Sequence, residues 1–173
     1  MAAKKEEKVI DEPKVAANKE PEELNLDAKV TVRSIADWET GFSRIADGSG
    51  DIRIMPKGTV RLSRNEIIAQ VQNGNALFGG VDGFGTHATL YIDDAPTRAE
   101  VGFEDNGKRQ LVFTNNLIKD LFKISNQAEF ENEFKDSIQT RAEKMAAVRA
   151  IRDLKLNDFN KIRFVEDYTG NKV

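Results

Sequence analysis

The sequence predicts an α+β fold, with antiparallel strands and hairpins over residues 28–113, one helix inserted among them, and a helical C-terminal third. Three observations predict this class. Apolar and polar residues alternate in several short segments before residue 113, which is typical of half-buried strands. Turn signals rich in glycine separate these segments. From residue 114 onward the apolar residues recur every three or four positions, as they do along packed helices.

Six short segments are expected to be strands because apolar side chains alternate within them. They are residues 29–35, 51–55, 59–62, 86–93, 97–103 and 110–113. Pro56-Lys57-Gly58 predicts a hairpin turn between the second and third of these segments. Asn106-Gly107 predicts another between the last two, because Asn-Gly adopts positive φ at low cost. The segment 37–42 can form either a short helix or a turn.

The inserted helix is expected over residues 64–73. Ser63-Arg64-Asn65-Glu66 matches a capping box, in which the serine accepts from one backbone amide and the glutamate reaches back to another. Ile67, Ile68 and Val71 form an apolar stripe. Asn73-Gly74 then supplies a left-handed stop.

Three helical patterns follow residue 114. Thr114 is the expected N-cap of the first, and Thr140-Arg141-Ala142-Glu143 is a capping box that opens the third. Residues 157–168 fit a helix or a strand. The apolar positions that define the three helices are Leu117, Ile118, Leu121 and Phe122, then Phe130, Phe134 and Ile138, then Met145, Val148 and Ile151.

The first 25 residues have a different composition from the rest of the chain. They carry five lysines, seven acids and two prolines, and few large apolar side chains. Such a segment cannot bury enough apolar surface to offset the ordering of its backbone, about 1–2 kcal/mol per residue. We expect residues 1–25 to be a charged, extended or disordered arm, and residues 26–173 to be a single α+β domain.

Composition excludes several classes of function. The 173 residues include no cysteine and one histidine, so thiol chemistry and Cys- or His-rich metal sites are not expected, and we assign no metal and no cofactor. No apolar run approaches the ~18 residues of a membrane helix, so no membrane partner is expected. The net charge of −3 disfavours a nucleic-acid coat.

The glycine-rich loop 79–85 is the first candidate site. It lacks the Lys-Ser/Thr of a phosphate-binding P-loop and precedes a strand, so phosphate binding is disfavoured. Phe84 stands between two glycines and is expected to be exposed enough to insert into a partner. We predict interaction residues Val81, Asp82 and Phe84 in this loop, with Val9 and Ile10 in the arm.

Two alternatives use other residues. His87 could act as a base beside Asp93 and Asp94 in an enzyme, but no nucleophile stands at a recognisable turn, so no catalytic residue is assigned. An adaptor or regulatory module could touch nucleic acid weakly through basic residues of the third helix. These residues are Arg141, Arg149 and Arg152.

Parts of the sequence resemble structural proteins of tailed-bacteriophage virions. The resemblance lies in Phe78–Tyr91 (FGGVDGFGTHATLY), Arg98–Phe103 and Asn157-Asp158-Phe159. It implies no catalytic residues, and it implies that the extended arm laces neighbouring subunits together.

The expected function is therefore a non-enzymatic structural subunit of a large protein assembly, a head or tail component of a bacteriophage virion. Its partners would be other protein subunits, including copies of itself, and nucleic acid is not expected among them. It would be made in the host cytoplasm and reside in the virion. The alternative is a small cytoplasmic adaptor or regulatory module.

Overall fold

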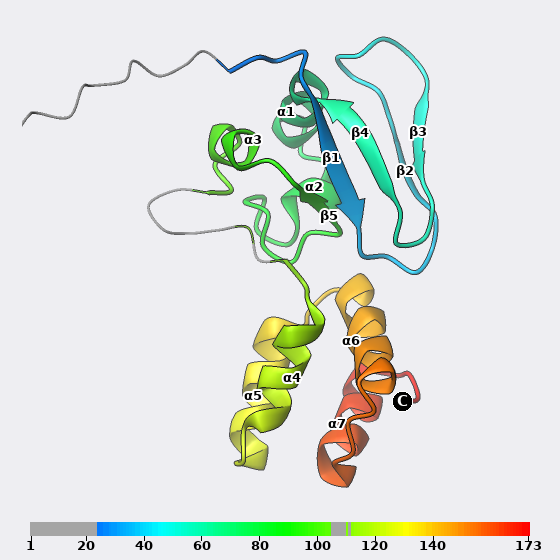
Figure 1. Cartoon of the computed structure of the whole chain (residues 1–173), viewed down its shortest axis with the longest axis vertical. Helices are drawn as coiled ribbons and strands as arrows, with labels where there is room; N and C mark the ends of the chain where they lie inside the picture. Colours follow the sequence, from blue (N-terminus) through cyan, green and yellow to red (C-terminus); the bar gives the residue numbers. More distant parts are fainter. Residues whose placement is uncertain (1–23, 105–109, 111) are drawn as a thin grey trace, which may run out of the picture.

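The computed structural model describes residues 24–104, 110 and 112–173, and it confirms the predicted α+β class (Figure 1). Strands and three short helices make up a first lobe, residues 24–104, and four helices make up a second, residues 113–173. The arm lies almost wholly outside the described residues, so its separation from a single domain over 26–173 remains a prediction.

A three-stranded antiparallel sheet forms the centre of the first lobe. β1 (Lys29–Ser34) lies between β4 (Thr59–Ser63) and β5 (Leu90–Ile92). Val32 of β1 stands opposite Val60 of β4 and Ile92 of β5. The alternation of apolar residues along these strands places Val30, Val32 and Leu62 in one core with side chains of α1 and α2.

A second, two-stranded ribbon pairs β2 (Thr40–Ser43) with β3 (Asp51–Ile54). The helix or turn expected over 37–42 is therefore wrong, and so is the hairpin between 51–55 and 59–62. The turn itself exists, because the Gly58 amide donates to the Met55 carbonyl at 2.8 Å. The Lys57 amide donates to the Ala36 carbonyl, and the Ser34 amide donates to the Gly58 carbonyl. These hydrogen bonds join the turn to the end of β1, so the chain passes here from the two-stranded ribbon to the three-stranded sheet.

Helix α1 (Arg64–Gln72) confirms the predicted inserted helix. The Ser63 hydroxyl accepts from the Glu66 amide, and Gly74 has φ of 73° just beyond the C-terminus. The capping box is only half formed, because the Glu66 carboxylate does not accept a hydrogen bond from the Ser63 backbone amide. It accepts instead from the backbone amides of residues 45–47.

Two further helices, α2 (Ala76–Gly79) and α3 (Ala95–Glu100), were not predicted. The strand expected over 97–103 is wrong, because Asp94 caps α3 at the Thr97 amide and Pro96 occupies its first turn. The strand expected over 86–93 shortens to β5.

The predicted turn at Asn106-Gly107 lies outside the described residues, and Gln110, Val112 and Phe113 are not in a strand. The Gln110 side chain instead accepts from the Ile92 amide at 3.3 Å and donates to the Leu90 carbonyl at 3.4 Å. A side-chain amide thus takes the place of a neighbouring strand at the edge of β5.

The second lobe consists of α4 (Asn115–Lys123), α5 (Gln127–Ser137), α6 (Arg141–Asp153) and α7 (Phe159–Thr169). Thr114 and Thr140 cap α4 and α6 as predicted, and the capping box of Thr140 and Glu143 is complete. Asp158 caps α7, so residues 157–168 are mainly helical. The buried core of this lobe includes Ile118, Phe130, Phe134, Ile151 and Val165.

A small third cluster joins the two lobes. Ile35, Ala36 and Tyr91 come from the first lobe and pack with Ala142 of α6. Trp38 and Phe113 cover them. Within the described ranges, no helix has the length and apolar character needed to cross a membrane.

Candidate functional site

The predicted interaction loop is closed by hydrogen bonds between its own residues. The Val81 amide donates to the Thr86 carbonyl at 2.9 Å, and the Gly85 amide donates to the Gly79 carbonyl at 2.8 Å. Inside the loop, the Asp82 carboxylate accepts from the Phe84 amide at 2.8 Å and from the Thr86 hydroxyl at 2.5 Å. The amides of Val81, Phe84 and Gly85 thus donate within the loop and are not free to bind a phosphate.

The charge of Asp82 is stabilised by the same contacts. Partial burial raises the pKa of this carboxyl. Hydrogen bonds from Thr86 and the Phe84 amide lower the pKa by more than burial raises it, so the net pKa lies below its ordinary value. The ionised carboxylate therefore acts as the internal brace of the loop.

Two glycines are needed at the base of the loop. Gly80 has φ of 68°, and a Cβ there would lie 1.9 Å from the Thr86 carbonyl oxygen. Gly85 has φ of 83°, and a Cβ there would lie 2.8 Å from the Phe103 ring. The glycine pattern seen in the sequence thus reflects a closely packed loop base.

The tip of the loop presents apolar side chains to solvent. Phe84 is 68% exposed and Val81 is 61% exposed, as the sequence predicted for Phe84. The loop therefore carries two predicted interaction residues on its surface and the third, Asp82, as their support. The other two, Val9 and Ile10, lie outside the described residues.

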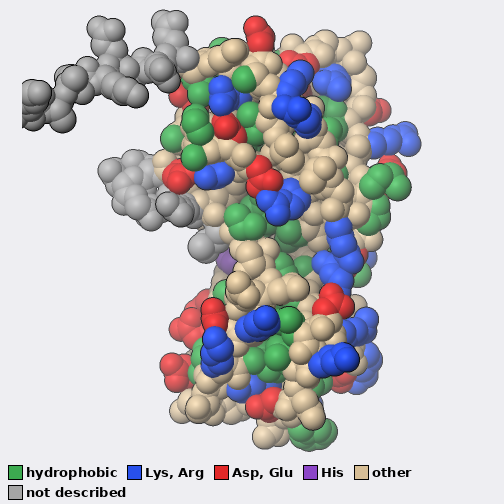
Figure 2. All heavy atoms as spheres, viewed as in Figure 1, with side chains coloured by type: hydrophobic (Ala, Val, Ile, Leu, Met, Phe, Trp, Pro, Cys, Tyr) green, Lys and Arg blue, Asp and Glu red, His purple; other side chains and the backbone are tan. Residues whose placement is uncertain are grey.

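His87 occupies a second candidate site, at the narrow waist between the lobes (Figure 2). His87 is 8% exposed, and its backbone φ of 57° is in the left-handed region. Nδ1 lies 2.8 Å from Oε1 of Glu143, which is also buried. The other Glu143 oxygen accepts from the Gln139 and Thr140 amides at 3.0 Å each.

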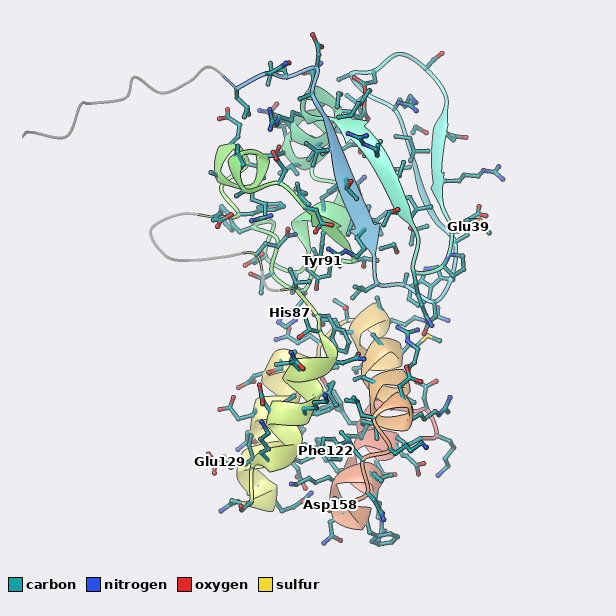
Figure 3. All side chains as sticks on the ribbon, viewed as in Figure 1. Glu39, His87, Tyr91, Phe122, Glu129 and Asp158 are labelled. Atoms are coloured by element: carbon teal, nitrogen blue, oxygen red, sulfur yellow. The ribbon has the colours of Figure 1, made fainter. Side chains whose placement is uncertain are left out.

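A cavity of about 430 Å³ adjoins this pair. Figure 3 labels His87 and Tyr91, the two residues of the strand lobe that line it. The Tyr91 hydroxyl accepts from the Phe113 amide at 3.1 Å, and burial raises the Tyr91 pKa to about 12. The lining comes from both lobes and from the segment that joins them.

The structure does not place His87 with Asp93 and Asp94, so the proposed enzymatic grouping is wrong. Asp93 pairs with Arg33 at 2.6 Å, and Asp94 pairs with Arg64 at 3.0 Å. Burial raises the Asp94 pKa, but bonds from Arg64 and Thr97 lower it more, so the net pKa is lowered. Among the described residues, no group of His, Cys, Asp and Glu side chains could hold a metal ion.

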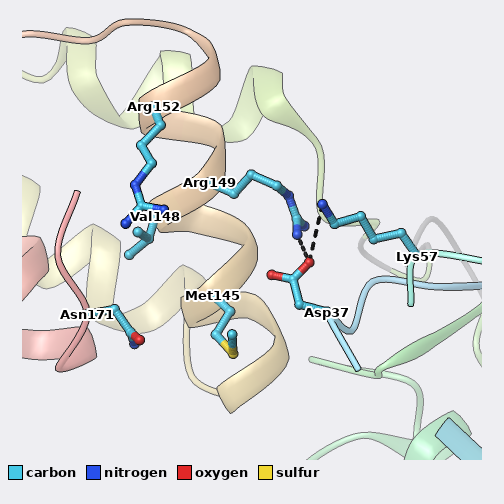
Figure 4. A pocket seen from close by; sticks show the side chains of 7 residues that line it. All are labelled: Asp37, Lys57, Met145, Val148, Arg149, Arg152 and Asn171. Carbon is cyan, nitrogen blue, oxygen red and sulfur yellow. Dashed lines mark ion pairs between the residues drawn. The ribbon is translucent and has the colours of Figure 1, made fainter. Parts of the chain in front are cut away.

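The basic residues of α6 are engaged in contacts within the chain. Arg141 lies over the Trp38 ring at 4.9 Å, and Arg152 donates to the Lys172 carbonyl. Arg149 pairs with Asp37 beside a hollow of about 250 Å³ (Figure 4). These contacts weaken the case for a nucleic-acid surface on this helix.

Sequence reasoning missed the partner of His87. Glu143 was assigned to a capping box, which it does form, and nothing local connects it to a histidine 56 positions earlier. Only the docking of α6 on the first lobe brings the two together.

No family model, no curated protein and no solved structure matches the chain.

Proposed function

We propose that the chain is a non-enzymatic structural subunit of a large protein assembly and docks on a neighbouring subunit through the predicted loop 79–85. Together with Thr86, which closes it, this loop is called loop 79–86. The observation that carries this proposal is a loop closed by its own hydrogen bonds, with two exposed apolar side chains, Val81 and Phe84. Aromatic side chains of this kind are common anchors at protein interfaces, where they fill a pocket on the partner.

The internal hydrogen bonds of the loop favour binding. Ordering a flexible segment on association opposes affinity, at about 0.5–1.5 kcal/mol for each immobilised side chain. Here the hydrogen bonds to the Asp82 carboxylate and the β-bridge between Gly80 and Thr86 order the loop backbone in the unbound chain. Burying the Phe84 ring then adds apolar contact at a small further loss of conformational freedom.

The sequence resemblance makes a bacteriophage virion the assembly that this proposal names. In such a particle, the predicted arm up to residue 23 would lie along neighbouring subunits, with Val9 and Ile10 as its apolar contacts. Binding of the arm would be coupled to its folding. The partners would be protein subunits.

The loop is tested with Phe84→Ser in cells that produce the assembly. Because Phe84 is exposed, the variant should keep its free energy of unfolding within about 0.5 kcal/mol. Its amount in purified particles, measured by quantitative mass spectrometry, should fall at least about tenfold. Phe159→Ser is the matched control, since Phe159 is 75% exposed but lies on α7.

Two outcomes contradict the proposal. Normal incorporation of Phe84→Ser removes the loop from the interface. Absence of the wild-type chain from every high-mass complex refutes the assembly role itself.

The arm is tested separately by deleting residues 2–23. The deletion stops there because the Asn25 carbonyl accepts from Arg64 and the Leu26 carbonyl accepts from the Asn65 amide, so these residues belong to the folded lobe. We expect an unchanged Tm and weaker incorporation. Incorporation equal to that of the full chain would refute lacing by the arm.

A further inference from the structure

The cavity at the lobe junction has the size of a small-molecule site. Its volume of about 430 Å³ falls within the ~300–1,000 Å³ range of ligand pockets. Its apolar walls come from the rings of Tyr91 and Phe113 and from the side chains of Val112 and Leu117. The polar lining consists of His87, Thr114, Asn116, Asp120, Asp136, Ser137 and Glu143.

The charged side chains that line the cavity are all acidic. Asp120, Asp136 and Glu143 contribute carboxylates, and none of the described residues that line the cavity is a lysine or an arginine. Glu143 is already used by His87 and the start of α6. Asp120 pairs with the exposed Lys123. Within the described part of the chain, the Asp136 carboxylate accepts no hydrogen bond and forms no ion pair.

His87 lines the same cavity and has one ring nitrogen, Nε2, that forms no hydrogen bond with a described residue. A carboxylate accepts and does not donate, so in the neutral imidazole the contact with Glu143 assigns the single ring proton to Nδ1. In that tautomer Nε2 carries a lone pair. This nitrogen has no partner among the described residues, although the residue is more than nine-tenths buried and lines the cavity.

We propose that this cavity binds a small primary amine with an aromatic or branched apolar body. The ammonium group donates to His87 Nε2 and is attracted by the Asp136 carboxylate. The apolar body packs between Tyr91, Phe113 and Leu117. An anion would meet three carboxylates and an imidazole lone pair, so the charge of the site selects against acids. This site is separate from loop 79–86 and does not depend on the assembly role.

The single histidine makes the test direct, because every imidazole signal in the spectrum belongs to His87. The full chain, labelled with ¹⁵N, is titrated with 2-phenylethylamine at about pH 8, where alkylammonium groups are charged. We expect the free protein to show the Nδ1–H tautomer. The amine should shift the Nε2 resonance saturably. The neutral 2-phenylethanol should bind at least about tenfold more weakly, and 3-phenylpropanoate more weakly still.

Two variants separate the site from general charge effects. Asp136→Asn should weaken amine binding about three- to tenfold while leaving the Tm unchanged, since its side chain is exposed and accepts no bond. Glu129→Gln is the control, because Glu129 is an exposed acid at the other end of the same helix (Figure 3). Its affinity for the amine should match that of the wild type.

Three results would each overturn the proposal. They are an Nε2–H tautomer in the free protein, equal affinity for the amine and the alcohol, and an Asp136→Asn variant that binds as tightly as Glu129→Gln. Because the readout is the His87 resonance and not particle assembly, these results leave the proposed function untouched.

Discussion

Replacing Glu66 by alanine should be among the most damaging single changes in the first lobe. Glu66 is fully buried, and its carboxylate accepts from the amides of Ile45, Ala46 and Asp47 at 2.8–3.0 Å. It also accepts from the Gln70 side chain at 2.8 Å. One side chain thus ties the segment between β2 and β3 to α1.

The magnitude follows from these four donors. A hydrogen bond to a charged group contributes about 1.5–3 kcal/mol, and a buried donor left without a partner costs about 1–3 kcal/mol. Water can reach part of the segment, because Ile45 is 46% exposed. We therefore expect Glu66→Ala to lower the free energy of unfolding by about 3–4 kcal/mol and the Tm by about 10 °C.

The assay is urea unfolding followed by circular dichroism, with Glu39→Ala as the control. The Glu39 side chain is 49% exposed, and its ion pair with Arg53 is long at 3.9 Å. Its loss should therefore lower the free energy of unfolding by less than about 0.5 kcal/mol. A loss below about 1 kcal/mol for Glu66→Ala would refute the idea that this carboxylate organises the segment.

The same carboxylate predicts a dependence on pH. Burial raises the Glu66 pKa, but bonds from Gln70 and the three amides lower it more, so the folded-state pKa lies below the ordinary value of 4.5. The stabilisation is therefore complete above that pH and is lost as the pH falls. The gap in stability between wild type and Glu66→Gln should narrow below about pH 4.5; a gap equally wide at about pH 3 would contradict the assignment.

Three further predictions concern other parts of the chain. Gly80→Ala should destabilise by at least about 2 kcal/mol in urea unfolding, since the new Cβ would clash with the Thr86 carbonyl; Gly74→Ala, which keeps the positive φ but meets no neighbour, should cost less. Asp94→Asn should lower the free energy of unfolding at neutral pH by about 1–2 kcal/mol and have a smaller effect in acid, because the pKa of Asp94 is lowered in the folded state and its contribution is lost as the pH falls. An equal loss of stability at neutral and acidic pH would count against the ion pair with Arg64. Tyr91 should ionise near pH 12 in a spectrophotometric titration read as the difference from Tyr91→Phe, and ionisation near pH 10 would contradict its burial.

The sequence predicted elements whose signals are local. The caps at Ser63, Thr114 and Thr140 place three helices correctly, because the capping side chain and the amide that it satisfies are three residues apart. The period of apolar residues after position 114 likewise depends only on neighbours along one helix.

The errors come from partners that are distant in sequence. Residues 51–55 and 59–62 have the right strand pattern, but the first pairs backward with β2 and the second with β1, a choice that the turn between them does not encode. In 97–103, the cap at Asp94 and Pro96 outweigh an alternation of only two apolar residues. His87 and Glu143 meet only because α6 docks on the strand lobe.

Helix α6 contacts both parts of the molecule. One face packs in the helical core through Ala147 and Ile151, while Ala142, Glu143 and Arg149 contact groups of the strand lobe. Apolar, charged and hydrogen-bonded contacts therefore join the two lobes through this one helix. A substitution that displaces this helix would therefore disturb the core of the helical lobe and the His87 contact of the strand lobe at the same time.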